Sequence, residues 1–219
     1  YLADAERPTV GVVLAGDKTP RGWASGKAAK FDAFDAKAEA LALLEAAGAP
    51  IANLQALGEA GGHYHPGQSG TLRLGPKTVL ASFGALHPAT AKAFDLDGPV
   101  MVAEIHLDAI PAKRATGFMR ADFTPPALQS VTRDFAFLVP ADLPAETLVR
   151  AVQGADRTHI TAARLFDRFT GQGGPEGQVS LAIEITLQPQ DKSFTEAELT
   201  AISYTVVAVA AKLGAVLRG

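Results

Sequence analysis

The stretch RLFDRFTGQGGPEGQVSLAIEITLQPQDKSFTEAE, residues 164–198, holds two strand patterns joined by a turn. In its second half, apolar residues alternate with polar or small ones; the apolar positions are Val179, Leu181, Ile183, Ile185 and Leu187. This period of two predicts a strand with one buried face and one wet face. Residues 160–169 also have a strand pattern, and the intervening GQGGPEG is rich in Gly and Pro. The two strands are therefore expected to form a hairpin.

The elements around this hairpin predict the fold. A strand is expected at 131–139, and a helix at 144–153 with Pro at its first position and a Gly stop signal after it. After the hairpin, Thr195 and Glu198 match a capping box at the start of a second helix, and a short strand is expected at 215–217. The order βαββαβ predicts a four-stranded antiparallel sheet with two helices on one face, the ferredoxin-like arrangement.

The residues before this region predict a separate antiparallel-sheet domain. The sequence favours strands at 9–15, 71–74, 78–83 and 100–107, and a helix at 35–47. Residues 111–129 are polar and contain proline, as is typical of a linker. We therefore expect an α+β protein of two domains, residues 1–118 and 124–219.

The first of these domains contains several weak signals of a functional site. The glycines and lysine of RGWASGKA, residues 21–28, lack the spacing of a phosphate-binding loop. His63 and His65 are too few for a zinc site, and the Pro66 that follows favours a turn. His87 precedes a proline and is expected just ahead of a short helix. No catalytic or metal-binding residue is predicted here.

Composition is typical of a globular protein. The 219 residues are 47% hydrophobic, and no apolar run approaches the roughly 20 residues of a membrane span. The absence of cysteine excludes disulfides and thiolate metal sites and suits a reducing compartment, so a cytoplasmic location is expected.

The net charge is −3, and residues 124–219 carry 8 basic and 10 acidic side chains. Such a domain is expected to bind RNA weakly by itself. Candidates for a local basic strip are Arg133, Arg150, Arg157, Arg164 and Arg168.

Three motifs in the C-terminal region carry a family resemblance. They are VTRDFAFLV (131–139), LFDRFTGQGGPEGQVSLA (165–182) and LQPQDKSFTEAEL (187–199). They resemble the ferredoxin-fold anticodon-binding domain of bacterial phenylalanyl-tRNA synthetase beta subunits. Residues 15–50 and 63–88 resemble the end of the catalytic-like module of that subunit, and the ending GAVLRG resembles its C-terminus. The resemblance therefore implies a C-terminal fragment of a longer beta subunit.

The resemblance also implies a role for each domain. In this family the alpha and beta subunits form an alpha2beta2 heterotetramer that uses ATP and Mg²⁺ to join phenylalanine to tRNA-Phe. The catalytic-like module of the beta subunit has lost its active-site residues and packs against the alpha subunit, which activates phenylalanine. The last domain recognises the tRNA anticodon. The fragment itself is therefore expected to hold no cofactor and to be inactive alone.

The predicted anticodon site lies on the hairpin. Asp167 and Phe169 share parity on one strand, so a carboxylate and an aromatic ring are expected on the same side. The carboxylate suits a guanine, which offers two N–H donors, and the ring suits base stacking, worth about 1 to 3 kcal/mol per base. The resemblance assigns contacts with the first anticodon guanine to Asp167, Phe169 and Ser180, which is expected on the wet face. Arg133 is a further candidate, near the anticodon stem.

Each assignment has a structural alternative. Asp167 is also suited to an ion pair with Arg164 or Arg168 at an edge strand, and Arg133 to one with Asp134. Phe166 is expected in the core because its parity opposes that of Asp167. Many family members have tyrosine at the position of Phe169 and a basic residue at that of Val179. For the chain as a whole, the alternative is a non-catalytic structural module, or a regulatory module that binds a small molecule on its sheet.

Overall fold

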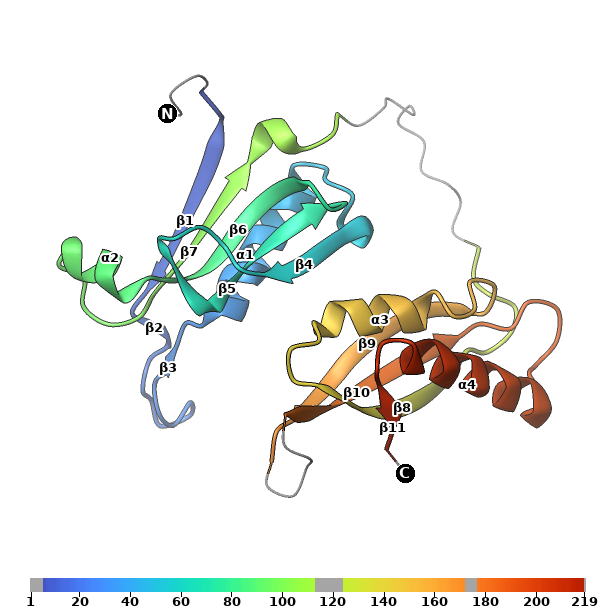
Figure 1. Ribbon diagram of the computed structural model, residues 1–219. Helices are drawn as coiled ribbons and strands as arrows, with labels where there is room; N and C mark the ends of the chain where they lie inside the picture. The colour runs from blue at the N-terminus through green and yellow to red at the C-terminus, as the bar shows by residue number, and fades with distance from the viewer. Residues whose placement is uncertain (1–5, 113–123, 172–176, 219) are drawn as a thin grey trace. The chain divides into compact units, whose positions relative to one another are not determined.

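The structure is a computed structural model that describes residues 6–112, 124–171 and 177–218 (Figure 1). The chain divides into two compact units, residues 1–118 and residues 119–219, here called the N-terminal and C-terminal units. Each has its own hydrophobic core. Most of the predicted linker falls outside the described residues. Within the described ranges, no helix combines the length and the apolar character needed to cross a membrane.

The N-terminal unit is built on a five-stranded antiparallel sheet with the order β1-β7-β6-β5-β4. Its strands are β1 (Thr9–Ala15), β4 (Leu54–Gly58), β5 (Tyr64–Leu74), β6 (Thr78–Leu86) and β7 (Val100–His106). Helix α1 (Ala33–Ala46) begins at a capping box between Asp32 and Asp35. It buries small and apolar side chains, among them Ala40 and Leu44, in the core formed with this sheet. The predicted antiparallel-sheet domain is confirmed.

Several elements of this unit were not predicted. Strand β4 was missed, and β5 begins at Tyr64 and includes Pro66 and Gly67, so the expectation of a turn after His65 is wrong. Strands β2 (Asp17–Thr19) and β3 (Ala29–Lys30) pair as a separate small ladder, and 3-10 turns occupy Ile51–Asn53 and Leu107–Ala109.

Helix α2 (Pro88–Ala93) begins where the sequence predicted a short helix. The Nδ1 atom of His87 caps it by accepting a hydrogen bond from the Ala89 N–H at 3.1 Å.

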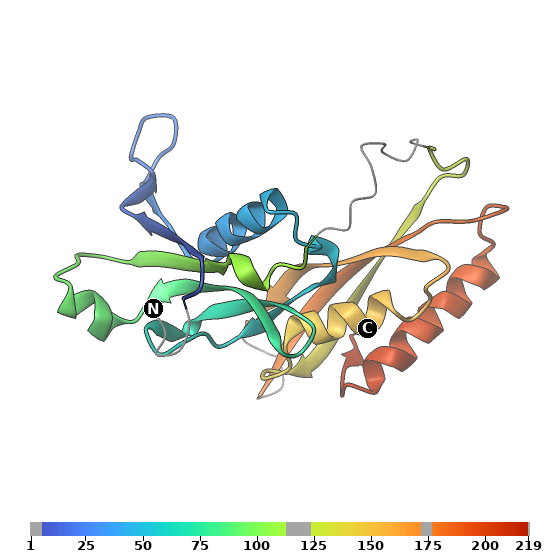
Figure 2. The same ribbon diagram turned by 90° about the horizontal axis from the view of Figure 1, so that it is seen from above.

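The C-terminal unit has the predicted βαββαβ order. Its elements are β8 (Val131–Pro140), α3 (Ala145–Gln153), β9 (Ile160–Phe169), β10 (Gln178–Leu187), α4 (Glu196–Ala211) and β11 (Val216–Leu217). The sheet is antiparallel in the order β11-β8-β10-β9, and Figures 1 and 2 show α3 and α4 together on one side of it. The predicted ferredoxin-like fold is confirmed. The opposite side of the sheet is called the helix-free face below.

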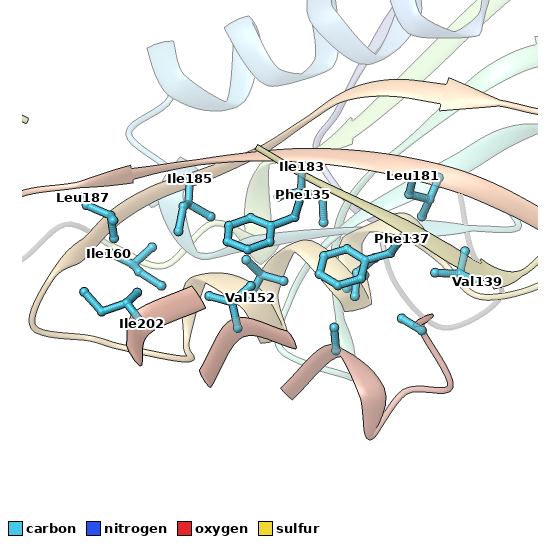
Figure 3. Packing of buried hydrophobic residues seen from close by; sticks show 14 of the residues in the cluster. Phe135, Phe137, Val139, Val152, Ile160, Leu181, Ile183, Ile185, Leu187 and Ile202 are labelled. Carbon is cyan, nitrogen blue, oxygen red and sulfur yellow. The ribbon is translucent and has the colours of Figure 1, made fainter. Parts of the chain in front are cut away.

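The core of this unit lies between the sheet and the two helices. Figure 3 shows the apolar side chains of β8 and β10 pointing toward the helices, among them Phe137 and Ile183, which have no exposed surface. The rings of Phe135 and Phe137 are nearly parallel, with centroids 6.1 Å apart. Both phenylalanines are in the core, as predicted. Because these residues fill one face of the sheet, their neighbours in sequence lie on the helix-free face.

Candidate nucleic-acid interface

The helix-free face carries two rows of side chains across all four strands. Residues directly opposite each other in a ladder share a face, so the register of the strands assigns each row. The first row is Val216, Leu138, Ser180 and Phe169. The second row is Arg218, Ala136, Ala182 and Asp167. Arg218 belongs to this row because it follows β11 directly and its N–H donates a hydrogen bond to the Ala136 carbonyl at 2.8 Å. Asp167, Phe169 and Ser180 therefore lie on one face.

A β-bulge places Asp167 and Phe169 on this face. Leu165 pairs with Ile183 of the core face, and Asp167 pairs with the next residue of β10, Ala182. Phe166 is therefore an extra residue without a partner in β10. Without it, the alternation from Leu165 would turn Asp167 toward the core. The bulge thus directs the carboxylate to the helix-free face.

The prediction that Phe166 is a core residue is wrong. Its side chain is 49% exposed. The prediction used strict alternation along the strand, and the bulge interrupts that alternation at this residue.

Phe169 presents an exposed aromatic ring beside this row. The residue is 48% exposed, and its ring lies close over the chain at Gly171. A Cβ atom at Gly171 would lie 2.1 Å from Cζ of Phe169, so this position accepts only glycine while the ring stays in place. The guanidinium carbon of Arg218 lies 5.9 Å from the ring centroid, within the range of a cation–π contact.

Ser180 is less accessible than predicted. It lies on the expected face, but only 7% of its surface is exposed, whereas the sequence predicted a wet position. It belongs to the central strand β10, and the larger side chains of Leu138 and Phe169 flank it in the same row. Ser180 therefore forms part of the floor of the site rather than its rim.

Arg133 does not join the other three predicted residues. Its partner in β10 is Ile185, a core residue, so Arg133 lies on the face of the sheet that the helices cover. There it lines a hollow beside α4 with Thr200 and Tyr204. Alternation along β8 instead puts Asp134 on the helix-free face, opposite Glu184. The structure thus corrects the expectation that Arg133 shares a site with Asp167.

A third row on this face carries charges of both signs. The Nε of Arg164 donates to Oε1 of Glu184 at 2.8 Å, and Asp134 lies on the other side of Glu184. The hydrogen bond from Arg164 lowers the pKa of Glu184 and raises that of Arg164. The ion pair of this strand edge is therefore made by Arg164 with Glu184. Asp167, in the next row, has no ion pair among the described residues.

A polar cluster of the N-terminal unit lies on the sheet face opposite α1. The Tyr64 hydroxyl donates to Oε2 of Glu104 at 3.2 Å, and Nε2 of His63 lies 3.1 Å from the same oxygen. Burial and the neighbouring Glu104 raise the pKa of Tyr64. His65 has a separate partner, the N–H of Gly67. In the described parts of the chain no three His, Cys, Asp or Glu side chains are placed to hold a metal ion such as Mg²⁺.

Sequence reasoning missed three features of the interface. They are Arg218, Gly171 and the bulge at Phe166. Gly171 stands in a turn already rich in glycine, so nothing in the sequence distinguished it. The position of Arg218 depends on β11, a strand of two residues whose register only the folded sheet defines.

Comparison with known proteins gives two family matches and many relatives. Residues 126–218 match the ferredoxin-fold anticodon binding domain, and residues 3–107 match the phenylalanyl tRNA synthetase beta chain CLM domain. The phenylalanine–tRNA ligase beta subunit of Novosphingobium aromaticivorans is 68% identical over 217 residues, 99% of this chain. Those of Zymomonas mobilis and Brucella abortus are 53% and 46% identical over 100% and 99% of the chain.

The chain spans only part of these relatives, 27% of the first and 28% of the other two. Both halves of the chain nevertheless match domains of one subunit, in the order that the sequence motifs predicted. The chain belongs to the family of phenylalanine–tRNA ligase beta subunits and contains the ferredoxin-fold anticodon binding domain of that family.

Proposed function

We propose that the C-terminal unit binds the anticodon of tRNA-Phe and reads the guanine at its first position. The observation that supports this most directly is the convergence of Asp167, Phe169 and Ser180 on the helix-free face of a domain that matches an anticodon-binding family. The bulge that turns Asp167 to this face supports the proposal further, because bulges often redirect a side chain at a functional site.

Each of the three residues has a distinct part in the proposed recognition. The Asp167 carboxylate accepts hydrogen bonds from the ring N–H and the exocyclic amine of guanine, while the base stacks on the ring of Phe169. The Ser180 hydroxyl adds a contact from the floor of the site. Adenine has no N–H at the corresponding ring nitrogen, so the carboxylate would face an acceptor and lose that hydrogen bond. Asp167 therefore supplies most of the discrimination.

The activity of the whole enzyme is part of the same proposal. We infer that the chain acts in the cytoplasm within an alpha2beta2 assembly that charges tRNA-Phe with phenylalanine, and that its N-terminal unit packs against the alpha subunit. ATP and Mg²⁺ belong to the alpha subunit in this proposal. The described residues of this chain do not fit a Mg²⁺ site, and no chemical step is assigned to them.

The proposal is tested by fluorescence anisotropy with an anticodon stem-loop of tRNA-Phe at low salt. A second stem-loop carries adenine in place of the first anticodon guanine. We expect the guanine form to bind at least about tenfold more tightly, since a hydrogen bond to a charged group is worth about 1.5 to 3 kcal/mol. Asp167→Asn should remove most of this preference. Asp142→Asn, an exposed carboxylate outside the sheet, is the matched control and should leave it unchanged. Equal binding of the two stem-loops by the unaltered chain would refute the proposal.

A further inference from the structure

The hairpin formed by β2 and β3 carries the single tryptophan of the chain near its tip. Trp23 is fully exposed, whereas tryptophan is on average a highly buried residue. Figures 1 and 2 show this hairpin projecting from the five-stranded sheet of the N-terminal unit. Residues 20–28, which connect the two strands, are called the Trp23 finger below.

Hydrogen bonds close the backbone of the Trp23 finger. Gly22 and Gly26 pair across the turn, with N···O distances of 3.2 and 2.8 Å. Gly26 has a φ of +72°, a left-handed conformation that glycine adopts without strain. The Ser25 hydroxyl donates to the Pro20 carbonyl at 2.9 Å. The turn therefore fixes the backbone on both sides of Trp23, which lowers the entropy cost of binding a ligand there.

Positive charge surrounds Trp23. Residues 17–30 contain four basic side chains and one acidic side chain, a net charge of +3 within a chain whose net charge is −3. The lysines of β2 and β3 form ion pairs with acidic residues at the base of the hairpin. Arg21 and Lys27, on the finger itself, make no ion pair among the described residues. Both cations are therefore available to a negatively charged ligand.

The size and chemistry of the Trp23 finger favour a nucleic acid over a protein as its ligand. Proteins bind single strands with aromatic rings on which bases stack and with cations that follow the phosphates. A specific protein interface instead buries about 800 Å² on each partner and has an apolar core. The finger offers one large apolar side chain, Trp23, among glycine, alanine and serine. It therefore suits one nucleotide better than a protein surface.

We propose that the Trp23 finger binds a single-stranded segment of RNA. A base stacks on the indole of Trp23, and Arg21 and Lys27 contact the neighbouring phosphates. The finger belongs to a different unit from the anticodon interface and takes no part in reading guanine at Asp167. Only the identity of the RNA, an unpaired part of tRNA-Phe outside the anticodon stem-loop, rests on the proposed function. Every base has a face that can stack, so the finger supplies affinity and little discrimination.

Intrinsic fluorescence tests the proposal, because all tryptophan emission of the chain comes from Trp23. The probe is an oligoadenylate of about eight nucleotides, within the usual site sizes of single-strand binding, titrated at low salt. Stacking of an adenine on the indole should quench the emission. Polyglutamate carries negative charge without bases and should quench it much less. Equal quenching by the two ligands would show attraction of charge alone and overturn the stacked site.

Substitutions give a second readout, measured by anisotropy of labelled oligoadenylate. They are made in a Phe169→Leu chain, so that the helix-free face contributes no aromatic stacking. Trp23→Ala should weaken binding at least about fivefold, which corresponds to the lower end of the stacking energy of a base, about 1 kcal/mol. Trp23→Tyr keeps an aromatic ring and should retain most of the affinity. Phe94→Ala is the matched control, an aromatic residue of the same unit that is 72% exposed outside the finger, and should change nothing.

The outcomes separate this proposal from the proposed function. Absence of quenching by both oligoadenylate and complete tRNA-Phe would overturn the RNA site. A blue shift of the Trp23 emission on addition of the alpha subunit would then assign the finger to a protein interface. The proposed function would survive these results if Asp167→Asn still removed the preference for guanine in the anticodon stem-loop. Quenching by oligoadenylate without any guanine preference would support the finger and refute the anticodon site.

Discussion

The orientation of the Phe169 ring depends on a glycine two residues further along the chain. Gly171→Ala would place a Cβ 2.1 Å from Cζ of that ring, so the ring must move. We expect this substitution to weaken binding of the guanine stem-loop, by at most as much as Phe169→Leu does, because it displaces the stacking ring whereas Phe169→Leu removes it. Anisotropy measures the loss. Gly62→Ala is the control, since a Cβ there meets no atom within 4 Å. Unchanged binding by Gly171→Ala would show that the ring is not needed in this position.

Two phenylalanines of the C-terminal unit are expected to differ in their effect on stability. Phe137 is completely buried and Phe166 is 49% exposed. Phe137→Ala should reduce the free energy of unfolding by about 3 to 5 kcal/mol, the range for large-to-small changes in a core. Phe166→Ala should cost less than about 1 kcal/mol, because little contact is lost at the surface. Urea unfolding of both variants measures the difference, and similar losses would place Phe166 in the core after all.

The sequence predicted which residues of β9 share a face but not which face that is. Parity groups Asp167 with Phe169 correctly, because no irregularity lies between them. It fails for Phe166, because a bulge depends on the register with β10 and the pattern of one strand does not contain that register. Arg133 shows the same limit in β8, where its partner Ile185 identifies the covered face.

At the scale of elements, helix α4 begins with a capping box that is sensitive to pH. The Thr195 N–H donates to Oε2 of Glu198 at 2.8 Å, and this hydrogen bond is the main cause that lowers the pKa of Glu198 to about 2. A carboxyl whose pKa is lower in the folded state stabilises the fold at pH above its unfolded value of 4.5 and loses this contribution as pH falls toward 2.

We therefore expect Glu198→Gln to destabilise the C-terminal unit at pH 7 and to have a shrinking effect between pH 4.5 and 2. Urea unfolding at several pH values measures the difference from the unaltered chain. Glu196→Gln, in the same helical turn, serves as the control because its carboxylate makes no hydrogen bond to Thr195 among the described residues. A difference that stays constant from pH 7 to pH 2 would contradict the assigned role of Glu198.

Most of the long elements were predicted well, and the short ones were not; the exception is β5, of which the sequence predicted only residues 71–74 as strand. Strands such as β10 and helices such as α4 repeat a pattern over ten or more residues, so the periodic signal outweighs local exceptions. Strands β2 and β3 have three and two residues, all exposed, and they exist because they pair with each other. No periodicity can form in so few residues. Contacts distant in the sequence produce such elements, and the same holds for the position of Arg218.

At the scale of the whole molecule, charge limits how the chain binds RNA. The net charge is −3, and the cations in the rows of the helix-free face are Arg164 and Arg218. Arg164 is already paired with Glu184. An interface of this kind binds mainly through stacking and hydrogen bonds to one base, with few phosphate contacts. Under the proposed function, most of the affinity for tRNA-Phe is then expected to come from other parts of the proposed assembly.

This limit predicts a weak salt dependence. A single-stranded phosphate contact contributes a slope of about 0.7 to the plot of log affinity against log salt, so two arginines give at most about 1.4. Anisotropy titrations of the stem-loop over a range of salt concentrations measure the slope. A slope of about 3 or more would require cations outside this face. The segment between β2 and β3 offers the next candidates, Arg21 and Lys27, near the fully exposed Trp23. In that case Arg21→Gln with Lys27→Gln should lower the slope by about 1.4 and leave the preference for guanine intact, because base identity is read at Asp167.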